Sequence, residues 1–513
     1  MYGKVTAVVV IGVRGHLVTV ESSIGRGLPA LCLTGLPGAS VQDARERVRP
    51  AVESSGLEWP LRRVVVNLSP VTIRKEGPGL DLPIAMSVLA ATSQFPTDEL
   101  PGYAFAAELS LKGELMPTPG ILAVAMAAKR RGLKGVVAPE ANAAEASLVE
   151  GLEVVAAPSL SAVVAFFRGR WKPGPIERSS PCEGALLNAV DLAEVRGQAQ
   201  ARRALEVAAA GGHNLLMVGP PGSGKTMLAR RLPTILPELT RDEALEVTQL
   251  HSVAGLLDGG GLLLARPFRS PHHSVSMAGL LGGGTGLARP GEVSLAHRGV
   301  LFMDEFNEFR RDAIEGLRQP LEEGRVVVIR AMGAVEFPAS FMLVAAANPC
   351  PCGHRGDPGR VCTCPENRIE SYRHKLSGPL LDRIDIRLSV PRMTPAELMS
   401  DQGAAEDSAT VRARVERVRA VQRRRYRELG FTCNAQVPGP LVRGCARLSS
   451  EAEVLLEAAA ETLHLSGRGF DRVLRVSRTI ADLEGDDRVT ATHLSEALAY
   501  RADLENREPV HVG

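Results

Sequence analysis

The sequence predicts an α/β fold: a phosphate-binding (P-loop) core with a helical C-terminal lid, preceded by an α+β domain. Three observations carry this prediction. A glycine-rich loop stands between an apolar strand and a helix at 215–232. Strands alternate with helices through the middle of the chain, which is typical of a mostly parallel sheet. After Pro391 the strand patterns stop and helical patterns follow.

The 513 residues are too many for one compact core, and length alone indicates about three domains. Short Val-rich strands and Ala-rich helical stretches share residues 1–168, which predicts the α+β domain. A stretch rich in Pro, Gly, Ser and charge predicts a linker at 169–184. The nucleotide-binding core is expected at 185–390 and the helical lid at 391–513. Helices are expected within the lid at 395–430, 450–465 and 469–500.

Composition points to a globular protein of a reducing compartment. The net charge of +2 does not single out a nucleic-acid binder, and eight Cys in so long a chain do not indicate a secreted disulfide scaffold. Arg14 and His16 interrupt the apolar start, so it predicts two strands rather than a signal peptide. No run of 18 or more apolar residues occurs, and we expect a cytoplasmic protein with no membrane partner.

The glycine-rich loop has the spacing G-x-x-x-x-G-K-T of a nucleotide-binding P-loop. Its residues are Gly219, Pro220, Pro221, Gly222, Ser223, Gly224, Lys225 and Thr226. The glycines let backbone N–H groups face phosphate oxygens, and the following helix N-terminus adds partial positive charge. We expect Lys225 to reach the β- and γ-phosphates of ATP and the Thr226 hydroxyl to ligate Mg²⁺.

Polar side chains also end the next two apolar strands. Asp304 and Glu305 follow the strand at 300–303, and ligands of open α/β sheets collect at such strand ends. We expect Asp304 to hold Mg²⁺, mainly through water, and Glu305 to orient or deprotonate the attacking water. Asn348 ends the strand at 341–347 and is expected to position that water. A lone Asn often only begins a turn. Asn348, however, is the third polar group in succession to follow an apolar strand, which favours a role at the site.

Four cysteines follow Asn348 within a window of 15 residues: Cys350, Cys352, Cys362 and Cys364. Four thiols in a reducing compartment predict a closed Cys₄ zinc site, with His354 as an alternative ligand. C-x-C spacing is less diagnostic than C-x-x-C, so four free thiols or a redox pair stay open. The pair His272–His273 has no acidic partner nearby in the sequence and stays unassigned.

An arginine-rich helix is predicted at 411–427. Val411, Val415, Val418 and Val421 recur at helical spacing, and eight Arg accompany a single Glu. Such a face suits phosphates, plain solvent or a subunit contact, and all three stay open.

The P-loop and the two polar strand ends, in this order, resemble the AAA+ superfamily. Residues 377–385, SGPLLDRID, resemble the segment that carries the arginine finger in the magnesium-chelatase and replicative-helicase branch, which implies that role for Arg383. A plain surface salt bridge is the alternative for Arg383. Residues 466–478 resemble the lid helix with the sensor-2 arginine, which implies that role for Arg468. Arg472 or Arg475 is the alternative.

Three further segments resemble parts of this branch. Residues 195–198 resemble the stretch beside the adenine. The glycine-rich segment 255–286 looks like the helix-2 insertion, and residues 324–337 look like the pre-sensor-1 hairpin. In this branch such hairpins line the pore of a ring.

The N-terminal segment resembles the Lon protease domain, an S5-like α+β fold. The resemblance lies in KEGPGLDLPIA at 75–85 and AELSLKGELMPTPGIL at 107–122. In Lon the first motif carries a nucleophilic Ser and the second a Lys that activates it, but here the positions hold Gly79 and Leu122. Glycine offers no nucleophile and leucine no base, so the resemblance implies the fold without the peptidase.

Over all three segments the chain resembles the ComM/YifB family of magnesium-chelatase-like AAA+ proteins. The resemblance implies a homo-hexameric ring that uses ATP and Mg²⁺ to move on DNA, single-stranded or branched, without sequence preference. It also implies branch migration in homologous recombination during natural transformation, with recombination proteins as further partners. An ATPase that remodels a protein partner, as in magnesium chelatase, stays open as the alternative. A Lon-like protease is disfavoured.

Overall fold

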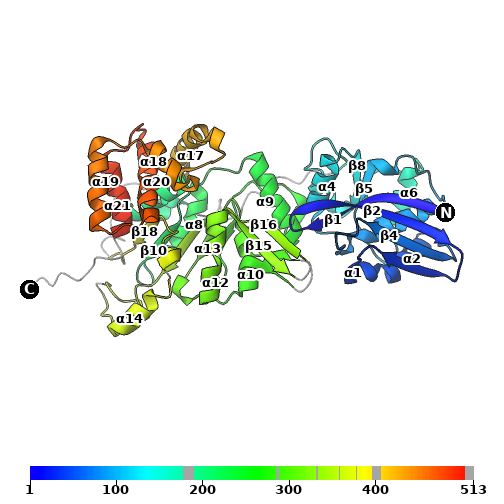
Figure 1. The fold of residues 1–513 in the computed structure, drawn as a ribbon, viewed down its shortest axis with the longest axis horizontal. Helices are drawn as coiled ribbons and strands as arrows, with labels where there is room; N and C mark the ends of the chain where they lie inside the picture. The colour runs from blue at the N-terminus through cyan, green and yellow to red at the C-terminus, as the bar shows by residue number, and fades with distance from the viewer. Residues whose placement is uncertain are drawn as a thin grey trace, which may run out of the picture.

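The structure is a computed structural model that describes residues 1–176, 190–284, 288–330, 333–357, 359–376, 378–394 and 406–502. Along its longest axis the chain runs from the N-terminal sheet domain, through the nucleotide-binding core, to the C-terminal helices (Figure 1). The linker predicted at 169–184 and the helix predicted at 395–430 fall partly outside the described residues.

The N-terminal domain is built on a mixed seven-stranded sheet of order β3-β4-β2-β1-β5-β8-β9. Its strands are β1 (Tyr2–Ile11), β2 (Arg14–Gly25), β3 (Ala30–Thr34), β4 (Arg63–Ser69), β5 (Tyr103–Phe105), β8 (Gly135–Pro139) and β9 (Glu153–Ala157). β1 and β2 form a long antiparallel hairpin, so the apolar start of the chain is two strands, as predicted. Beside it, β1, β5, β8 and β9 run parallel.

Helices cover both faces of this sheet because β1 alternates its apolar side chains between them. Val5, Ala7 and Val9 join the apolar cluster that contains α3 (Asp81–Ala91), while Val8 joins the cluster that contains α4 (Ile121–Arg130). All eleven residues of α3 are buried, which explains why the helix is almost entirely apolar. The remaining elements are α1 (Ala39–Gln42), α2 (Ala44–Ser54), the hairpin β6 (Glu108–Leu109) and β7 (Leu115–Met116), α5 (Ala143–Ala146) and α6 (Leu160–Phe167).

The core is a five-stranded sheet of order β11-β14-β17-β10-β18 in which all neighbours are parallel. The strands are β10 (Leu215–Val218), β11 (Phe268–Arg269), β14 (Val300–Met303), β17 (Met342–Ala347) and β18 (Ile386–Ser389). The helices α7 (Ala199–Gly211), α8 (Lys225–Ile235) and α9 (Arg241–Ala254) accompany it. The α/β fold class is therefore confirmed, and the carboxyl ends of all five strands share one edge.

Two insertions lie between the strands of the core. Between β11 and β14 come α10 (Met277–Leu281), β12 (Gly282–Gly283), β13 (Arg289–Pro290) and α11 (Glu292–Leu295). Between β14 and β17 come α12 (Arg311–Gly316), α13 (Arg318–Glu323) and the hairpin β15 (Arg325–Arg330) and β16 (Gly333–Pro338). The two antiparallel strands β15 and β16 confirm the hairpin predicted at 324–337.

The lid contains α17 (Ser408–Arg425), α18 (Gly439–Ala446), α19 (Ser450–Thr462), α20 (Gly467–Glu484) and α21 (Ala491–Ala502). Gly485 ends α20 in a left-handed conformation, so the helical stretch predicted at 469–500 is two helices. Three valines of α17 pack into the core cluster, but Val421 is exposed, and the predicted apolar stripe is one residue too long. Among the described helices, none has the length and apolarity that a membrane crossing requires.

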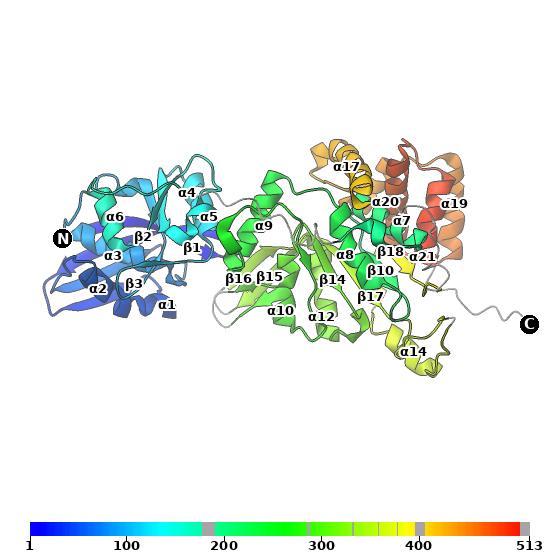
Figure 2. The ribbon, with the colours of Figure 1, turned by 180° about the vertical axis from the view of Figure 1, so that it is seen from behind.

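The N-terminal domain docks on the core through α9 and the β15–β16 hairpin, which lie between the two sheets in both views (Figures 1 and 2). The Gln249 side chain of α9 donates to the carbonyl oxygen of Val13. The Ser252 carbonyl accepts from the Gly120 amide at 3.2 Å, and the Ser252 hydroxyl donates to the buried Glu145 carboxylate. The domain that resembles Lon is thus joined to the core through the start of α4.

Candidate nucleotide-binding site

The P-loop leaves the buried strand β10 and turns into α8 on two glycines in the left-handed region. Gly222 has φ 77° and Gly224 φ 90°, a conformation that costs glycine little. No described atom lies within 4 Å of the position that a Cβ on Gly222 would take. Gln198, which precedes α7, donates to the carbonyl oxygen of Ser223 at 2.7 Å and so restrains the loop. The loop therefore has the open cradle and the helix N-terminus that bound phosphate requires.

Lys225 is held by its own loop. Its Nζ donates to the carbonyl oxygens of Gly219 at 2.7 Å and Pro220 at 2.9 Å, and to Asn348 Oδ1 at 3.4 Å. Burial lowers the pKa of Lys225 to about 8, although the nearby Asp304 carboxylate opposes this. The P-loop lysine and the polar end of β17 thus meet, and a phosphate would give the buried ammonium a charged partner.

Thr226 and Asp304 form an oxygen pair suited to Mg²⁺. The Thr226 hydroxyl donates to Asp304 Oδ2 at 2.7 Å, and the Glu305 amide donates to Asp304 Oδ1 at 2.9 Å. Hydroxyl and carboxylate oxygens are the ligands that Mg²⁺ prefers, together with phosphate oxygens and water. The two residues expected to hold the metal therefore fit it in type and position.

Glu305 has the left-handed conformation, φ 50° and ψ 47°, at the start of a short turn over Phe306–Glu308. Such backbone is costly for a residue with a side chain, and the Glu305 side chain is 56% exposed. His273 Nδ1 lies 3.6 Å from Glu305 Oε2. The unassigned histidine pair thus has an acidic neighbour 32 positions away. His273 stands four positions after the last residue of β11, so the strand-end signal that identified the other residues does not mark it.

Arg383 and Arg468 lie elsewhere, at the amino edge of the core sheet. Arg383 precedes β18, and its carbonyl oxygen accepts from Asn214, the residue before β10, at 2.9 Å. The P-loop follows the other end of β10, roughly 13 Å away at the usual rise per residue. Both arginines meet Glu322: Arg383 in a close ion pair, and Arg468 Nη2 at 3.3 Å. Neither arginine therefore contacts the P-loop of its own chain.

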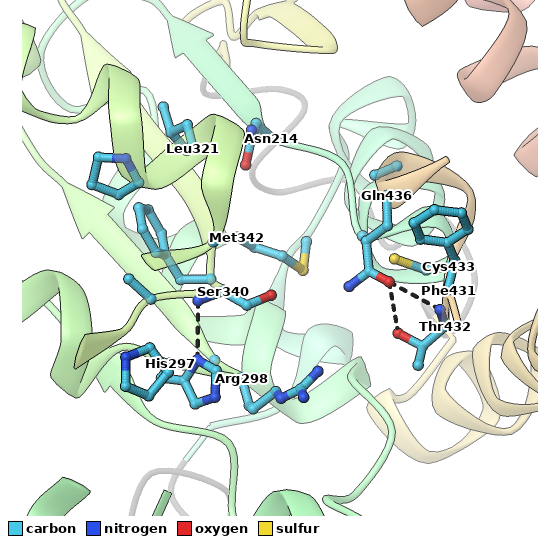
Figure 3. Close-up of a pocket in the computed structure, with 18 of the residues that line it drawn as sticks. Asn214, His297, Arg298, Leu321, Ser340, Met342, Phe431, Thr432, Cys433 and Gln436 are labelled. Carbon is cyan, nitrogen blue, oxygen red and sulfur yellow. Dashed lines mark hydrogen bonds between the residues drawn. The ribbon is translucent and has the colours of Figure 1, made fainter. Parts of the chain in front are cut away.

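A cavity of about 1110 Å³ opens at this amino edge, between the core and the lid, and includes Arg383 and Arg468 in its lining. Figure 3 shows Asn214, Ser340 and Met342 on the core side and Phe431 and Gln436 on the lid side. The cavity lies away from the residues that would bind ATP, so its size does not identify the nucleotide site. It does identify a concave, arginine-lined surface.

The two alternative lid arginines serve packing inside the chain. Arg472 is buried and pairs with Asp385 at 3.1 Å, and Arg475 donates to the carbonyl oxygen of Val437 at 2.7 Å. Arg468 keeps 59% of its side chain exposed. All three line the cavity, but Arg468 is the exposed one, and its partner there is Glu322.

Sequence models of magnesium chelatase match most of the chain. "Magnesium chelatase, subunit ChlI" matches residues 191–398, its C-terminal part matches 405–501, and "Subunit ChlI of Mg-chelatase" matches 20–142. "Competence protein ComM" of Haemophilus influenzae is 42% identical over 96% of this chain and 96% of its own length. "Uncharacterized protein YifB" of Escherichia coli is 43% identical over 96% of this chain and 95% of its own.

The chain belongs to the ComM/YifB family. It is accordingly an AAA+ ATPase, and the family implies ATP and Mg²⁺ at the site formed by the P-loop and the ends of β14 and β17.

The N-terminal domain of this ComM/YifB protein is also similar to Lon protease of Rhizobium meliloti, at 27% identity over 38% of this chain and 25% of that one. The two positions that matter for peptidase chemistry are inert. Gly79 has no side chain, and Leu122 is fully buried in α4 while its amide donates to Glu145 at 2.8 Å. Lys75 lies four positions before Gly79, but the lysine is buried and its Nζ donates to the carbonyl oxygens of Gly35, at 2.9 Å, and Pro70.

The four cysteines of this family member converge. Their sulfur atoms all lie within 4.8 Å of one another, and Cys350 Sγ is 3.4 Å from Cys352 Sγ and 3.6 Å from Cys362 Sγ. A tetrahedral Zn–S₄ site with bonds of about 2.3 Å has sulfurs about 3.8 Å apart, whereas a disulfide requires about 2.05 Å. The donor set therefore fits zinc. His354 stands outside the group, with Nδ1 3.7 Å from Asp357 Oδ2.

The arginine-rich helix α17 divides into two sets. Arg414 pairs with Glu206 and Glu406, Arg419 donates to the Ala209 carbonyl oxygen, and Arg425 pairs with Asp482, so these three hold the lid to the core or to itself. The residues left exposed for another partner are Arg417, Arg423 and Arg424.

Proposed function

We propose that this protein is an ATP-driven motor that moves single-stranded or branched DNA through a homo-hexameric ring, as a helicase and branch-migration factor in natural transformation. The observation that carries the proposal is the near full-length similarity to a protein named Competence protein ComM. The nucleotide site supports it, because Lys225 contacts Asn348 and Thr226 contacts Asp304. A cytoplasmic location is part of the proposal.

Each residue of the site has a role in hydrolysis. Lys225 binds the phosphates, and Mg²⁺ held by Thr226 and Asp304 supplies charge neutralisation on them. Glu305 takes the proton of the attacking water, and Asn348 orients that water. The oxygen of the water bonds to the γ-phosphorus while the bond to the β-phosphate oxygen breaks, which leaves ADP and phosphate.

Arg383 and Arg468 act in trans. They lie at the sheet edge opposite the P-loop and share a cavity, so a neighbouring subunit that enters this cavity with its nucleotide would meet both. Glu322 balances their charge in the isolated chain. This arrangement supports a ring in which every chain supplies arginines to the next one.

The two insertions of the core form the DNA-contacting surface. Ile329 and Arg330 end strand β15, and Ile329 is 77% exposed. The Arg330 guanidinium lies against Gly283 of β12, so close that a Cβ there would be 2.5 Å from Nη2. Arginine on phosphate does not distinguish bases, so binding is independent of sequence and weakens steeply with salt.

The test measures ATP turnover without DNA and with single strands, duplex and a four-way junction, and branch-point movement on a labelled junction. We expect the four-way junction to stimulate ATP turnover most. We also expect branch migration to separate it into duplexes only when ATP is present. The Lys225→Ala protein serves as control. If the junctions stay intact and none of the DNA substrates changes ATP turnover, the second candidate is favoured, an ATPase that remodels a protein partner. The magnesium-chelatase similarity supports that candidate.

We also propose a structural zinc ion at Cys350, Cys352, Cys362 and Cys364, on the sulfur geometry given above. Metal analysis of the full chain, purified without chelator, should give about one zinc per chain. Less than about a tenth of that from zinc-replete preparations refutes the ion.

A further inference from the structure

We infer that the cysteine knuckle, defined as residues 350–364, is a brace for the nucleotide site, so that bound zinc sets the affinity for nucleotide. The inference rests on the zinc ion proposed above. It adds a function to that ion, because the knuckle touches the P-loop on one side and is tied to the turn after Glu305 on the other.

The first contact joins the knuckle to the P-loop. Gly353 has φ 81°, and a Cβ built on it would lie 2.6 Å from Pro221 Cδ and 2.7 Å from Pro221 Cγ. Such distances are far shorter than a carbon–carbon contact of about 3.5 to 4.0 Å. The Gly353 backbone is therefore packed directly on the ring of Pro221, in the middle of the loop that would hold the phosphates.

The second contact joins the knuckle to the turn that follows Glu305. Arg355 pairs with Glu366 at 2.8 Å, and Glu366 begins α14 (Glu366–Arg373). The carbonyl oxygen of Tyr372, near the end of α14, accepts from Asn307 Nδ2 at 2.9 Å. Asn307 is buried within the turn over Phe306–Glu308, so α14 transmits the position of the knuckle to the base of Glu305.

Within its described residues the knuckle contains neither helix nor strand to fix its path. A tetrahedral metal would fix it instead, because four bonds tie both ends of the loop at Cys350–Cys352 and Cys362–Cys364. Cys350 stands two positions after Asn348, which itself contacts Lys225. Loss of zinc would therefore free the surface on which Pro221 rests and loosen the end of β17.

Two glycines of the knuckle provide a matched pair for the test. Gly353 and Gly356 have φ of 81° and 76°, so alanine introduces similar backbone strain at either position. No described atom lies within 4 Å of a Cβ on Gly356, whereas a Cβ on Gly353 meets Pro221. Any difference between Gly353→Ala and Gly356→Ala therefore reports the contact with the P-loop rather than the strain.

The experiment measures zinc content and the Kd for ADP with Mg²⁺ by titration calorimetry on the full-length protein. We expect both variants to keep about one zinc per chain, with ADP binding about tenfold weaker in Gly353→Ala, which is about 1.4 kcal/mol, and within about twofold of wild type in Gly356→Ala. Equal affinities in the two variants would overturn the brace.

A double variant, Cys362→Ala with Cys364→Ala, removes two ligands and tests the metal dependence directly. We expect it to lose zinc and to bind ADP at least about tenfold more weakly, with its helical circular dichroism retained. A folded, zinc-free double variant that binds ADP like wild type would also overturn the brace. Zinc content of the wild type tests the metal itself, ADP affinity of the variants tests the brace, and DNA-stimulated turnover tests the motor, so the failure of each proposal can be distinguished.

Discussion

Two buried lysines show how the N-terminal domain and the core differ. Lys75 and Lys225 each place Nζ on two backbone carbonyl oxygens, and burial lowers the pKa of both. Lys225, however, also faces Asn348 and lies near Asp304 across an open loop. Lys75 faces only packed chain, with Gly79 where Lon has its nucleophile. The comparison teaches that a buried cation becomes part of a reactive site only when polar groups and space for a substrate surround it.

The region that corresponds to the Lon active site has a structural role in this chain. Leu122 is the second residue of α4 and lies between Gly120 and its partner Glu145, and these last two residues bind Ser252 of the core helix α9. The region that is catalytic in Lon is therefore a docking surface here. The core, in contrast, keeps its polar strand ends directed toward the place where phosphate would lie.

The largest expected effect separates the two lysines. Lys225→Ala removes the side-chain cation of the P-loop, so we expect ATP turnover per folded chain to fall at least about 100-fold. Lys75→Met should do the opposite, lowering Tm through its unpaired carbonyl oxygens while turnover per folded chain stays near wild type. Turnover assays and thermal melts on both variants check this. Loss of turnover in folded Lys75→Met protein would break the comparison.

Glu305→Gln sharpens the comparison inside the core. The amide keeps the shape of the side chain but cannot accept a proton, so we expect hydrolysis to fall about 100-fold while ADP affinity stays within about threefold. Steady-state turnover and ADP titration give the two numbers. Full turnover in this variant would remove Glu305 from the role of base.

Arg383 tests whether the amino edge completes a neighbouring site. Arg383→Ala alone and Lys225→Ala alone should both be inactive, yet mixed rings should recover part of the activity, because some interfaces pair an intact arginine with an intact P-loop. Turnover is measured across mixing ratios, with mixed assembly verified by a tag on one variant. The absence of recovery in verified mixed rings would count against action in trans.

The strand-end residues could be predicted from sequence because local pattern decides them. An apolar run followed by a polar residue defines Asp304 and Asn348, and parallel strands bring such ends together. The partners of Arg383 and Glu305 could not be predicted. Glu322 and His273 lie 61 and 32 positions away, and only the folded insertions bring them into contact.

Two other expectations depended on tertiary packing in the same way. Val421 continues the apolar spacing of α17, yet it is 38% exposed, because the buried side of the helix continues after Val418 through Gln422 and Tyr426 instead. The sequence does not distinguish the arginines of that helix, yet only some of them are bound within the chain. Carboxylates and carbonyl oxygens from distant segments bind Arg414, Arg419 and Arg425. Helical periodicity fixes which side chains share a face, and the neighbouring element decides what that face meets.

The pH dependence of nucleotide binding is a smaller effect. Lys225 has a pKa of about 8 in the free protein, and bound phosphate favours its charged form. Binding therefore takes up a proton above pH 8, and affinity falls as pH rises. We expect the Kd for ADP with Mg²⁺ to increase about fivefold between pH 8 and pH 9. Titrations in two buffers of different ionisation enthalpy measure the proton uptake. A Kd that is constant over this range would contradict the assignment.

The smallest expected effect concerns His273, the neighbour of Glu305 that sequence did not reveal. Both side chains are partly exposed, at 37% and 56%, so their interaction is weak, but it restrains a carboxylate whose backbone is already in an unusual conformation. We expect His273→Ala to lower kcat about two- to fivefold, the range of an exposed charged pair, with KM unchanged because the histidine contacts no P-loop residue. His272→Ala is the matched control, since its Nδ1 interacts with the Ser274 hydroxyl instead. Equal kcat values for the two variants would show that the contact does not orient Glu305. A change in KM alone would instead place His273 among the groups that bind nucleotide.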